Sequence, residues 1–387
     1  MMKGVRIARV VLAALAVVAG AGWSTEASTA TAGPPVATWK SAAPGRPIVL
    51  PADHASHPDY KLEWWYYTGN LDGPQGERFG FQVTFFRVGV DPNPAGRSRW
   101  AVRDLFMTHV ALTDARGRRY LFAERLNRSG PGWAGAETER YHVWNEDWQA
   151  SLDGQAHRLR ASAVSNGEDG TRFGLDLTLD ETMPPALHGD RGYSRKGTDP
   201  GNASHYYSLP RMPTRGTVTL EGKTFMVTGL SWMDHEFGTS FLEPGQVGWD
   251  WFAVQLSDGR SLMLYRFRRS DQARDPRSSG TLIDANGRTT AVNFEQVTMT
   301  PQRTWTSPTS RATYPIGWTL SLPREQLELT VAPVLENQEL QTTESTGVTY
   351  WEGAIDVSGT SAGRPVTGRG YLEMTGYSGA AMTNYLR

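Results

Sequence analysis

Hydrophobic positions along this chain gather in short runs that polar turn signals separate. Residues 79–86 and 261–267 are rich in aromatic, aliphatic and β-branched side chains, which is typical of strands. Pairs such as Asp72-Gly73 and Asn286-Gly287 favour tight hairpins, because both residue types tolerate a positive φ. No long apolar stripe of helical period is present, so the pattern predicts an all-β protein. The polar, glycine-rich residues 187–202 are expected to form a long surface loop.

The two halves of the chain carry matching motifs in the same order. Two of the three matches share an offset of 170 residues, and the matched pairs are 112–118 with 282–288, 148–152 with 318–322, and 227–232 with 366–371. An internal repeat of this kind indicates a duplicated structural unit. We therefore expect two homologous β-domains, residues 48–240 and 241–387, each long enough for a barrel or a sandwich. The alternative is that hairpin chemistry alone produces these similarities.

The first 32 residues are organised like a secretory signal peptide. Three basic residues precede an apolar run at residues 10–22, which is too short to span a bilayer comfortably. Small residues follow, with cleavage expected after Ala30 or Ala32. We expect a secreted or periplasmic protein without a membrane span once the signal is removed. An uncleaved N-terminal anchor is the alternative.

Composition excludes several classes of function. The 387 residues include 39 basic and 40 acidic side chains, so no basic surface points to nucleic acid. The absence of cysteine excludes disulfides, thiolate chemistry and cysteine-ligated zinc. The chain has no G-x-S-x-G elbow, no P-loop and no G-x-G-x-x-G ahead of a helix, and we expect no cofactor.

Seven segments between residues 57 and 377 form a recognisable set: 57–58, 63–71, 80–87, 203–208, 232–236, 248–252 and 370–377. Together they resemble the lipocalin-like family that groups the AttH proteins with carotenoid 1,2-hydratase (hydroxyneurosporene synthase, CrtC-like). The resemblance implies two tandem lipocalin-like β-barrel domains, in agreement with the internal repeat. It also implies a hydrophobic small-molecule ligand and, as for AttH-type proteins, association with an ABC-type export system.

Three ionisable residues in a row, Asp234, His235 and Glu236, are the candidate catalytic group. On a strand, positions 234 and 236 share one face. Paired carboxylates near a histidine can raise the pKa of one acid and make it a proton donor. The alternative is a hydrogen-bonded network that joins the two domains. A zinc-protease motif is excluded, because Thr239 stands where H-E-x-x-H requires its second histidine.

Aromatic side chains are the candidate substrate-binding set: Trp64, Trp65, Tyr67, Tyr206, Tyr207, Trp232, Trp249, Trp251 and Tyr265. Aromatic walls suit an extended or polycyclic apolar ligand, and their faces stabilise a carbocation. Because consecutive strand residues alternate faces, we expect about half of residues 64–67 to point into a barrel. Ordinary barrel-core packing is the alternative for each of them.

Four histidines complete the candidate residues: His54, His57, His109 and His205. Metal binding requires that they converge, which their spacing does not show, so we expect structural roles and no metal. Arg87 and Arg211 are candidate buried partners for Asp234 or Glu63.

Two functions remain open for this chain. The first is a secreted carrier of an isoprenoid- or polyketide-like ligand. The second is a cofactor-free hydratase or cyclase-type lyase, in which the resemblance implies Asp234 or Glu236 as the acid. The resembled hydratases pair a His-x-Trp with a Tyr-x-Asp, whereas this chain has Phe237 and Phe267 at those last positions, which favours the carrier. An open apolar cavity with a raised carboxylate pKa would instead favour the enzyme.

Overall fold

The computed structural model describes residues 38–379 except 95–97, 99, 168–169, 241 and 293, so the predicted signal peptide lies outside it. Within these ranges the chain forms strands and two short 3₁₀ turns, η1 (Ala52–His54) and η2 (Phe294–Gln296), and no α-helix. No helix of the described residues is long and apolar enough to cross a membrane. The all-β prediction is confirmed.

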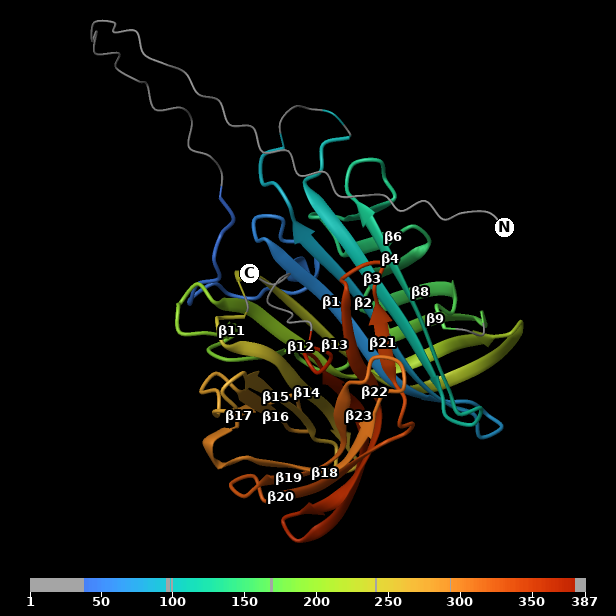
Figure 1. Cartoon of the computed structure of the whole chain (residues 1–387), viewed down its shortest axis with the longest axis vertical. Coiled ribbons are helices and arrows are strands. Elements are labelled where there is room, and N and C mark those ends of the chain that lie inside the picture. Colours follow the sequence, from blue (N-terminus) through green and yellow to red (C-terminus); the bar gives the residue numbers. More distant parts are fainter. Residues whose placement is uncertain are drawn as a thin grey trace, which may run out of the picture. The chain divides into compact units, whose positions relative to one another are not determined.

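The first sheet is antiparallel, contains 13 strands in the described residues and curls into a nearly closed barrel (Figure 1). Its strands are β1 (Leu62–Asp72), β2 (Arg78–Gly89), β3 (Asp104–Asp114), β4 (Arg119–Arg128), β5 (Ala134–Ala136), β6 (His142–Asn145), β7 (Trp148–Asp153), β8 (Ala156–Val164), β9 (Arg172–Asp180), β10 (Ala186–Leu187), β11 (Tyr193–Arg195), β12 (Ala203–Leu220) and β13 (Lys223–Ser240). Their order is β4-β3-β2-β1-β13-β12-β9-β8-β7-β6-β5, and β10 and β11 pair with β12.

The second sheet has 10 described strands and forms a half-barrel. Its strands are β14 (Gln246–Leu256), β15 (Ser261–Arg269), β16 (Ser279–Ile283), β17 (Thr289–Ala291), β18 (Thr298–Thr306), β19 (Thr313–Leu322), β20 (Leu327–Pro333), β21 (Glu339–Thr342), β22 (Val348–Ser361) and β23 (Arg364–Met374). Their order is β17-β16-β15-β14-β23-β22-β20-β19-β18, and β21 pairs with β22. Both sheets belong to one compact unit.

The internal repeat of the sequence has a counterpart in this topology. The run β4-β3-β2-β1-β13-β12 of the first sheet corresponds to β17-β16-β15-β14-β23-β22 of the second. Residues 112–118 and 282–288 both end one strand and form the hairpin turn that follows it, while 227–232 lie on β13 and 366–371 on β23. In each sheet the last strand pairs with the first, which is how a meander closes towards a lipocalin-like barrel.

Predicted turn pairs lie at hairpins between consecutive strands. Gly154 joins β7 to β8 with φ 66°, and Gly287 joins β16 to β17 with φ 83°. Side chains with a Cβ rarely adopt this left-handed conformation, so glycine at these two positions makes the tight turns possible.

Alternation along β1 divides its aromatic residues between two environments. Trp65 and Tyr67 belong to the core of the first barrel, which also holds residues of β2, β3 and β9. Trp64 and Tyr66 point the other way, into a separate apolar cluster that includes Trp251 and Tyr265 of the second sheet. The prediction that half of residues 64–67 face a barrel interior is therefore confirmed, and the other half meet the second sheet.

Residues 187–202 are not the exposed loop that their polarity predicted. Strands β10 and β11 attach this segment to β12, and it buries His188 (1% exposed) and Lys196 (5% exposed). Each polar side chain has a partner there: His188 contacts the hydroxyls of Ser208 and Thr281, and Lys196 contacts Glu236. Burial of these polar groups is tolerated because they are hydrogen-bonded or paired.

Candidate active site

A cavity lies between the two sheets, with about 1200 Å³ of empty space, part of it open to solvent. Strands β1, β2, β3 and β13 line it from one side and β14, β15, β22 and β23 from the other. Nine of the residues that line it are aromatic: Trp64, Tyr66, Phe86, Tyr206, Trp249, Trp251, Tyr265, Phe267 and Tyr350. Aromatic walls of this kind suit an apolar ligand with fused rings or an extended chain.

Five carboxyl groups line this space: Glu63, which is paired with Arg87, and Asp234, Glu236, Glu352 and Glu373. Asp234 and Glu236 come from alternate positions of β13, so they share its cavity face, as the sequence predicts. Glu352 of β22 and Glu373 of β23 stand directly opposite each other in the antiparallel register. Asp234, Glu236 and Glu352 are buried, with exposed fractions of 4%, 4% and 1%. A concentration of acidic groups at an apolar cavity is what acid–base chemistry requires.

Asp234 is surrounded by hydrogen-bond donors. The Tyr206 hydroxyl donates to Oδ2 at 2.7 Å, and the indole Nε1 of Trp232 donates to Oδ1 at 2.6 Å. The Ser208 hydroxyl also donates to Oδ1. Burial raises the pKa of Asp234 to about 7, although these three donors favour the ionised form and oppose the shift. Asp234 is therefore able to give or take a proton near neutral pH.

Glu352 and Glu373 form a like-charged pair. Burial and the charge of Glu373 raise the pKa of Glu352 well above its usual range. Burial raises the pKa of Glu373 to about 7, while a hydrogen bond from Trp249 Nε1, at 3.0 Å, opposes this shift. The Tyr66 hydroxyl donates to Glu352. Since two carboxylates cannot both ionise cheaply in one buried site, the pair retains a proton at neutral pH.

A buried cation balances Glu236. Lys196 Nζ lies 2.7 Å from Glu236 Oε1, and the Ser204 hydroxyl donates to the same oxygen. Burial opposes the charge on this lysine, but Glu236 overcomes it and raises the pKa of Lys196. The ammonium also lies over the rings of Tyr206 and Tyr265, at 4.7 and 4.8 Å from their centroids. One end of the cavity thus carries a buried ion pair.

The structure brings together seven of the residues predicted from sequence: Asp234, Glu236, Trp64, Tyr206, Trp249, Trp251 and Tyr265. Trp232 lies directly behind this wall, where it donates to Asp234 and packs edge-on against Trp251 with ring centroids 6.2 Å apart. Four others are turned towards the interior of the first barrel: His235, Trp65, Tyr67 and Tyr207. They are the alternate residues of the same strands, so the pleat separates them from the cavity.

His235 belongs to an ionic network inside the first barrel. Its Nε2 lies 3.0 Å from Glu63 Oε1, and its ring stacks on Trp65 with centroids 5.0 Å apart. Arg87 binds Glu63 at 3.0 Å and Asp104 at 2.9 Å, which confirms its predicted role as a buried partner of Glu63. Burial alone would raise the pKa of Glu63, but hydrogen bonds from His235 and His57, together with the Arg87 charge, hold it well below the usual range.

The remaining predicted residues occupy distinct places. Arg211 donates to backbone oxygens of Leu256 and Arg260 rather than to Asp234 or Glu63. His109 lines the cavity, with Nδ1 2.7 Å from the Tyr350 hydroxyl, and burial lowers its pKa to about 3. His205 is buried against the ring of Phe237, with centroids 5.2 Å apart.

Sequence reasoning included Tyr66 in the aromatic set but missed three charged residues of the cavity: Lys196, Glu352 and Glu373. Glu373 lies within the recognised segment 370–377, so that signal was available. Lys196 lies in the polar segment that was expected to be exposed. Glu352 has no local motif, because only its pairing with β23 places it at the site.

Comparisons with known proteins agree with this architecture. A two-domain lipocalin-like fold around a carboxylate-bearing cavity is the class that the structure defines. Residues 41–377 match the AttH-like family, and the chain belongs to that family. The crystal structure of an AttH-type protein from Nitrosomonas europaea is similar at 34% identity, with a TM-score of 0.77, and the match covers 87% of this chain and 99% of that one.

Two further relatives are named for reactions with water. Kievitone hydratase from Nectria haematococca shares the fold, with 18% identity, a TM-score of 0.66 and coverage of 89% of this chain and 97% of that one. The dehydratase AsqC of Emericella nidulans is 23% identical over 209 residues, which are 52% of this chain and 57% of that protein. The chain thus spans little more than half the length of this curated relative.

Proposed function

We propose that this protein is a cofactor-independent lyase that adds water to, or removes water from, an apolar small molecule. The carrying observation is Asp234, a buried carboxyl with a pKa of about 7 in the wall of an aromatic cavity. Among the described residues, no arginine or lysine forms an ion pair with Asp234, Glu352 or Glu373. An acid–base catalyst needs a carboxyl that titrates near neutral pH, and Asp234 meets this requirement.

The proposed reaction assigns separate roles to the carboxyl groups. In dehydration, ionised Asp234 takes a proton from the substrate carbon next to the carbon that bears the hydroxyl. A protonated carboxyl of the Glu352–Glu373 pair gives its proton to that hydroxyl, which leaves as water while the C=C bond forms. Hydration is the reverse sequence. The three donors around Asp234 hold its charge whenever it is ionised, which keeps the base in place for the next turnover.

The walls of the cavity point to a polycyclic or polyketide-like substrate that bears an oxygen. Aromatic faces contact its rings, and the Lys196 ammonium is available to polarise a carbonyl or phenolic oxygen. The names of the relatives, a dehydratase and a hydratase, support this class of reaction. Phe267 lines the cavity where the resembled carotenoid hydratases have an acid, so we do not extend the proposal to carotenoids. Glu352 and Glu373 supply the acid from neighbouring strands instead.

The test is isotope exchange with a substrate panel. Purified protein is incubated with polyketide-like and isoprenoid alcohols and alkenes in H₂¹⁸O, and products are followed by mass spectrometry for gain or loss of water. We expect turnover by the wild type and a fall of about 10²- to 10⁴-fold for Asp234→Asn. Asp153→Asn is the matched control, because that carboxylate is 70% exposed and lies in a hairpin away from the cavity.

The second candidate function is a carrier of a hydrophobic ligand, which the large aromatic cavity alone would also serve. The same experiment separates the two. If a compound of the panel binds the wild type and Asp234→Asn equally, and neither protein adds or removes water, the carrier function is supported and the lyase is refuted.

We further propose that the protein works outside the cytoplasm. N-terminal sequencing of protein from the culture medium should then begin at Thr31 or Gly33, and an intact Met1 would refute export by cleavage.

A further inference from the structure

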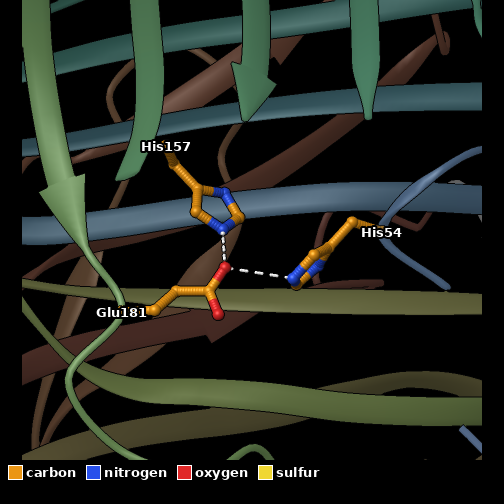
Figure 2. A group of neighbouring side chains, drawn as sticks. All are labelled: His54, His157 and Glu181. Carbon is orange, nitrogen blue, oxygen red and sulfur yellow. Dashed lines mark hydrogen bonds and ion pairs between the residues drawn. The ribbon is translucent and has the colours of Figure 1, made fainter. Parts of the chain in front are cut away.

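Three side chains of the kind that bind metals converge inside the first barrel, away from the cavity. His54 comes from η1, His157 from β8 and Glu181 from the position directly after β9. Figure 2 shows both imidazoles directed at one oxygen of the carboxylate. His54 Nε2 lies 3.0 Å and His157 Nε2 2.7 Å from Glu181 Oε1. All three ligand atoms lie within 4.8 Å of one another.

One tautomer of His54 has a lone pair on Nε2. When the Tyr207 hydroxyl donates to the Asp53 carbonyl at 3.2 Å, it accepts a hydrogen bond from His54 Nδ1 at 2.6 Å. With the proton on Nδ1, Nε2 is an acceptor and faces the carboxylate of Glu181, which is another acceptor. Nε2 has no hydrogen-bond partner although the side chain is 0% exposed. An unpaired buried acceptor aimed at an anion is unfavourable unless a cation lies between them.

His157 repeats this arrangement from the opposite strand. Its Nδ1 lies 2.7 Å from the Tyr67 hydroxyl, which lies 2.6 Å from the Tyr141 hydroxyl. In one tautomer His157 Nε2 donates to Glu181 Oε1, whereas when Tyr67 donates to Tyr141 and accepts from His157 Nδ1, the proton lies on Nδ1 and Nε2 is free to bind a cation. Tyrosines that fix the tautomers from behind are the second layer that metal-binding histidines usually have.

Among the described residues, the ionic partners of Glu181 are His54 and His157. In the part of the chain that the structure describes, no arginine or lysine forms an ion pair with it. The neighbouring group of His57, Glu63 and His235 also meets the geometric requirement for a metal, but there Arg87 and the Ser56 hydroxyl already bind Glu63. A metal in that second group would have to displace a buried arginine, so the group at Glu181 is the better candidate.

From this geometry we propose that His54, His157 and Glu181 bind a divalent transition-metal ion, with Zn²⁺ the best fit. Two imidazole nitrogens and one carboxylate oxygen are ligands that zinc accepts with bonds of about 2.0–2.1 Å, and a tetrahedral site sets ligand atoms about 3.3 Å apart. The contacts of 2.7 and 3.0 Å need to open by only a few tenths of an ångström. Glu181 is 18% exposed and is able to make this adjustment.

The site would join three separate parts of the chain. The ion would tie the segment before β1 to β8 and to the end of β9, and water from the exposed side of Glu181 would complete its coordination. Its effect is therefore expected on stability. This proposal does not rest on the lyase activity, because none of its three ligands lines the cavity.

The test is calorimetric titration of the whole chain, stripped of metal by a chelator, with Zn²⁺. We expect one equivalent to bind, and excess Zn²⁺ to raise Tm by several degrees through mass action. Glu181→Gln should weaken binding at least tenfold, since the amide is a poor ligand. His142→Ala is the matched control: His142 lies 3.0 Å from Glu137 in a half-exposed pair that has a single histidine, and its loss should change nothing.

Two results would overturn the proposal. One is the absence of heat and of any Tm shift with wild-type protein at millimolar Zn²⁺. The other is binding that survives Glu181→Gln but is lost in His235→Asn, which would place the ion in the neighbouring group. Should a variant fail to fold, X-ray absorption at the zinc edge of the wild type decides. Two imidazoles and an oxygen ligand support the site, and any other number of imidazoles contradicts it.

Discussion

The cavity between the sheets and the interior of the first barrel contain the same kinds of ionisable side chain in opposite electrostatic states. In the barrel, Arg87 and two histidines surround Glu63 and hold its pKa low. In the cavity, Asp234 and Glu373 have hydrogen-bond donors but no paired cation, and burial raises the pKa of each to about 7. Matched charges make a rigid structural core, whereas unmatched ones are costly to the fold and available for proton transfer.

The largest effect is expected from removing Arg87, the buried cation of the barrel. Arg87→Met should lower the free energy of unfolding by about 3–5 kcal/mol, because Glu63 and Asp104 would stay buried without their partner. Urea denaturation at pH 7 measures this. A loss below about 1 kcal/mol would mean that the barrel network contributes no more than a surface pair.

In the cavity, removing an ionisable side chain is expected to raise the free energy of unfolding. Glu373 is ionised in the unfolded chain above its ordinary pKa, but in the folded protein it retains its proton up to pH of about 7. The wild type therefore loses stability as pH rises from about 4.5 to 7, and Glu373→Gln should remove this loss. The same substitution removes the electrostatic repulsion between Glu373 and the carboxyl groups of Glu352, Asp234 and Glu236.

The expected gain for Glu373→Gln is up to about 3 kcal/mol at pH 8, at about 1.4 kcal/mol for each unit of the raised pKa, and none at pH 4. Denaturant unfolding at the two pH values measures it. Glu63→Gln is the control from the barrel, and it should destabilise the protein at pH 8. A loss of stability in both variants would show that the two regions do not differ.

Two adjacent tyrosines of β1, one in each region, should show a smaller difference in stability when each is changed to phenylalanine. Tyr67→Phe leaves the Tyr141 hydroxyl and His157 Nδ1 without their buried partner and should cost about 1–3 kcal/mol. Tyr66→Phe should cost no more than about 1 kcal/mol, because water entering the cavity can replace its hydroxyl beside Glu352. Thermal and urea unfolding of both variants would contradict us if Tyr66→Phe proved the more costly change.

The smallest effect is expected outside both regions. Arg160 and Asp176 form an ion pair at 2.7 Å, with both side chains more than half exposed. Arg160→Ala should change the free energy of unfolding by no more than about 0.5 kcal/mol. This variant sets the baseline for the urea series, and a larger change would show that exposed pairs matter more here than expected.

Local patterns were enough to predict much of the fold. Strand-like runs, glycine turns and the repeat at an offset of 170 residues led to the all-β, two-barrel architecture. Alternation also placed Asp234 and Glu236 on one face of β13 before any contact was known. These features depend on neighbouring residues, which a sequence displays directly.

Features that depend on contacts between residues far apart in the sequence could not be predicted from local patterns. Glu352 meets the site only because β22 pairs with β23 and faces the first sheet. Lys196 is buried because Glu236, 40 positions away, compensates its charge. His54 and Glu181 meet only when the barrel closes, so the spacing of the histidines did not indicate a metal site.

Strand β13 has a consequence for how this protein can be altered or can evolve. Its even positions 232, 234 and 236 serve the cavity, and its odd positions 233 and 235 serve the barrel. Point substitutions at positions 232 and 236 can thus change substrate choice while the barrel and the proposed base Asp234 stay intact. Insertion or deletion of one residue would exchange the two sets and ruin both regions at once. New specificities in this family should therefore arise by substitution along β13 and by length changes only in its loops.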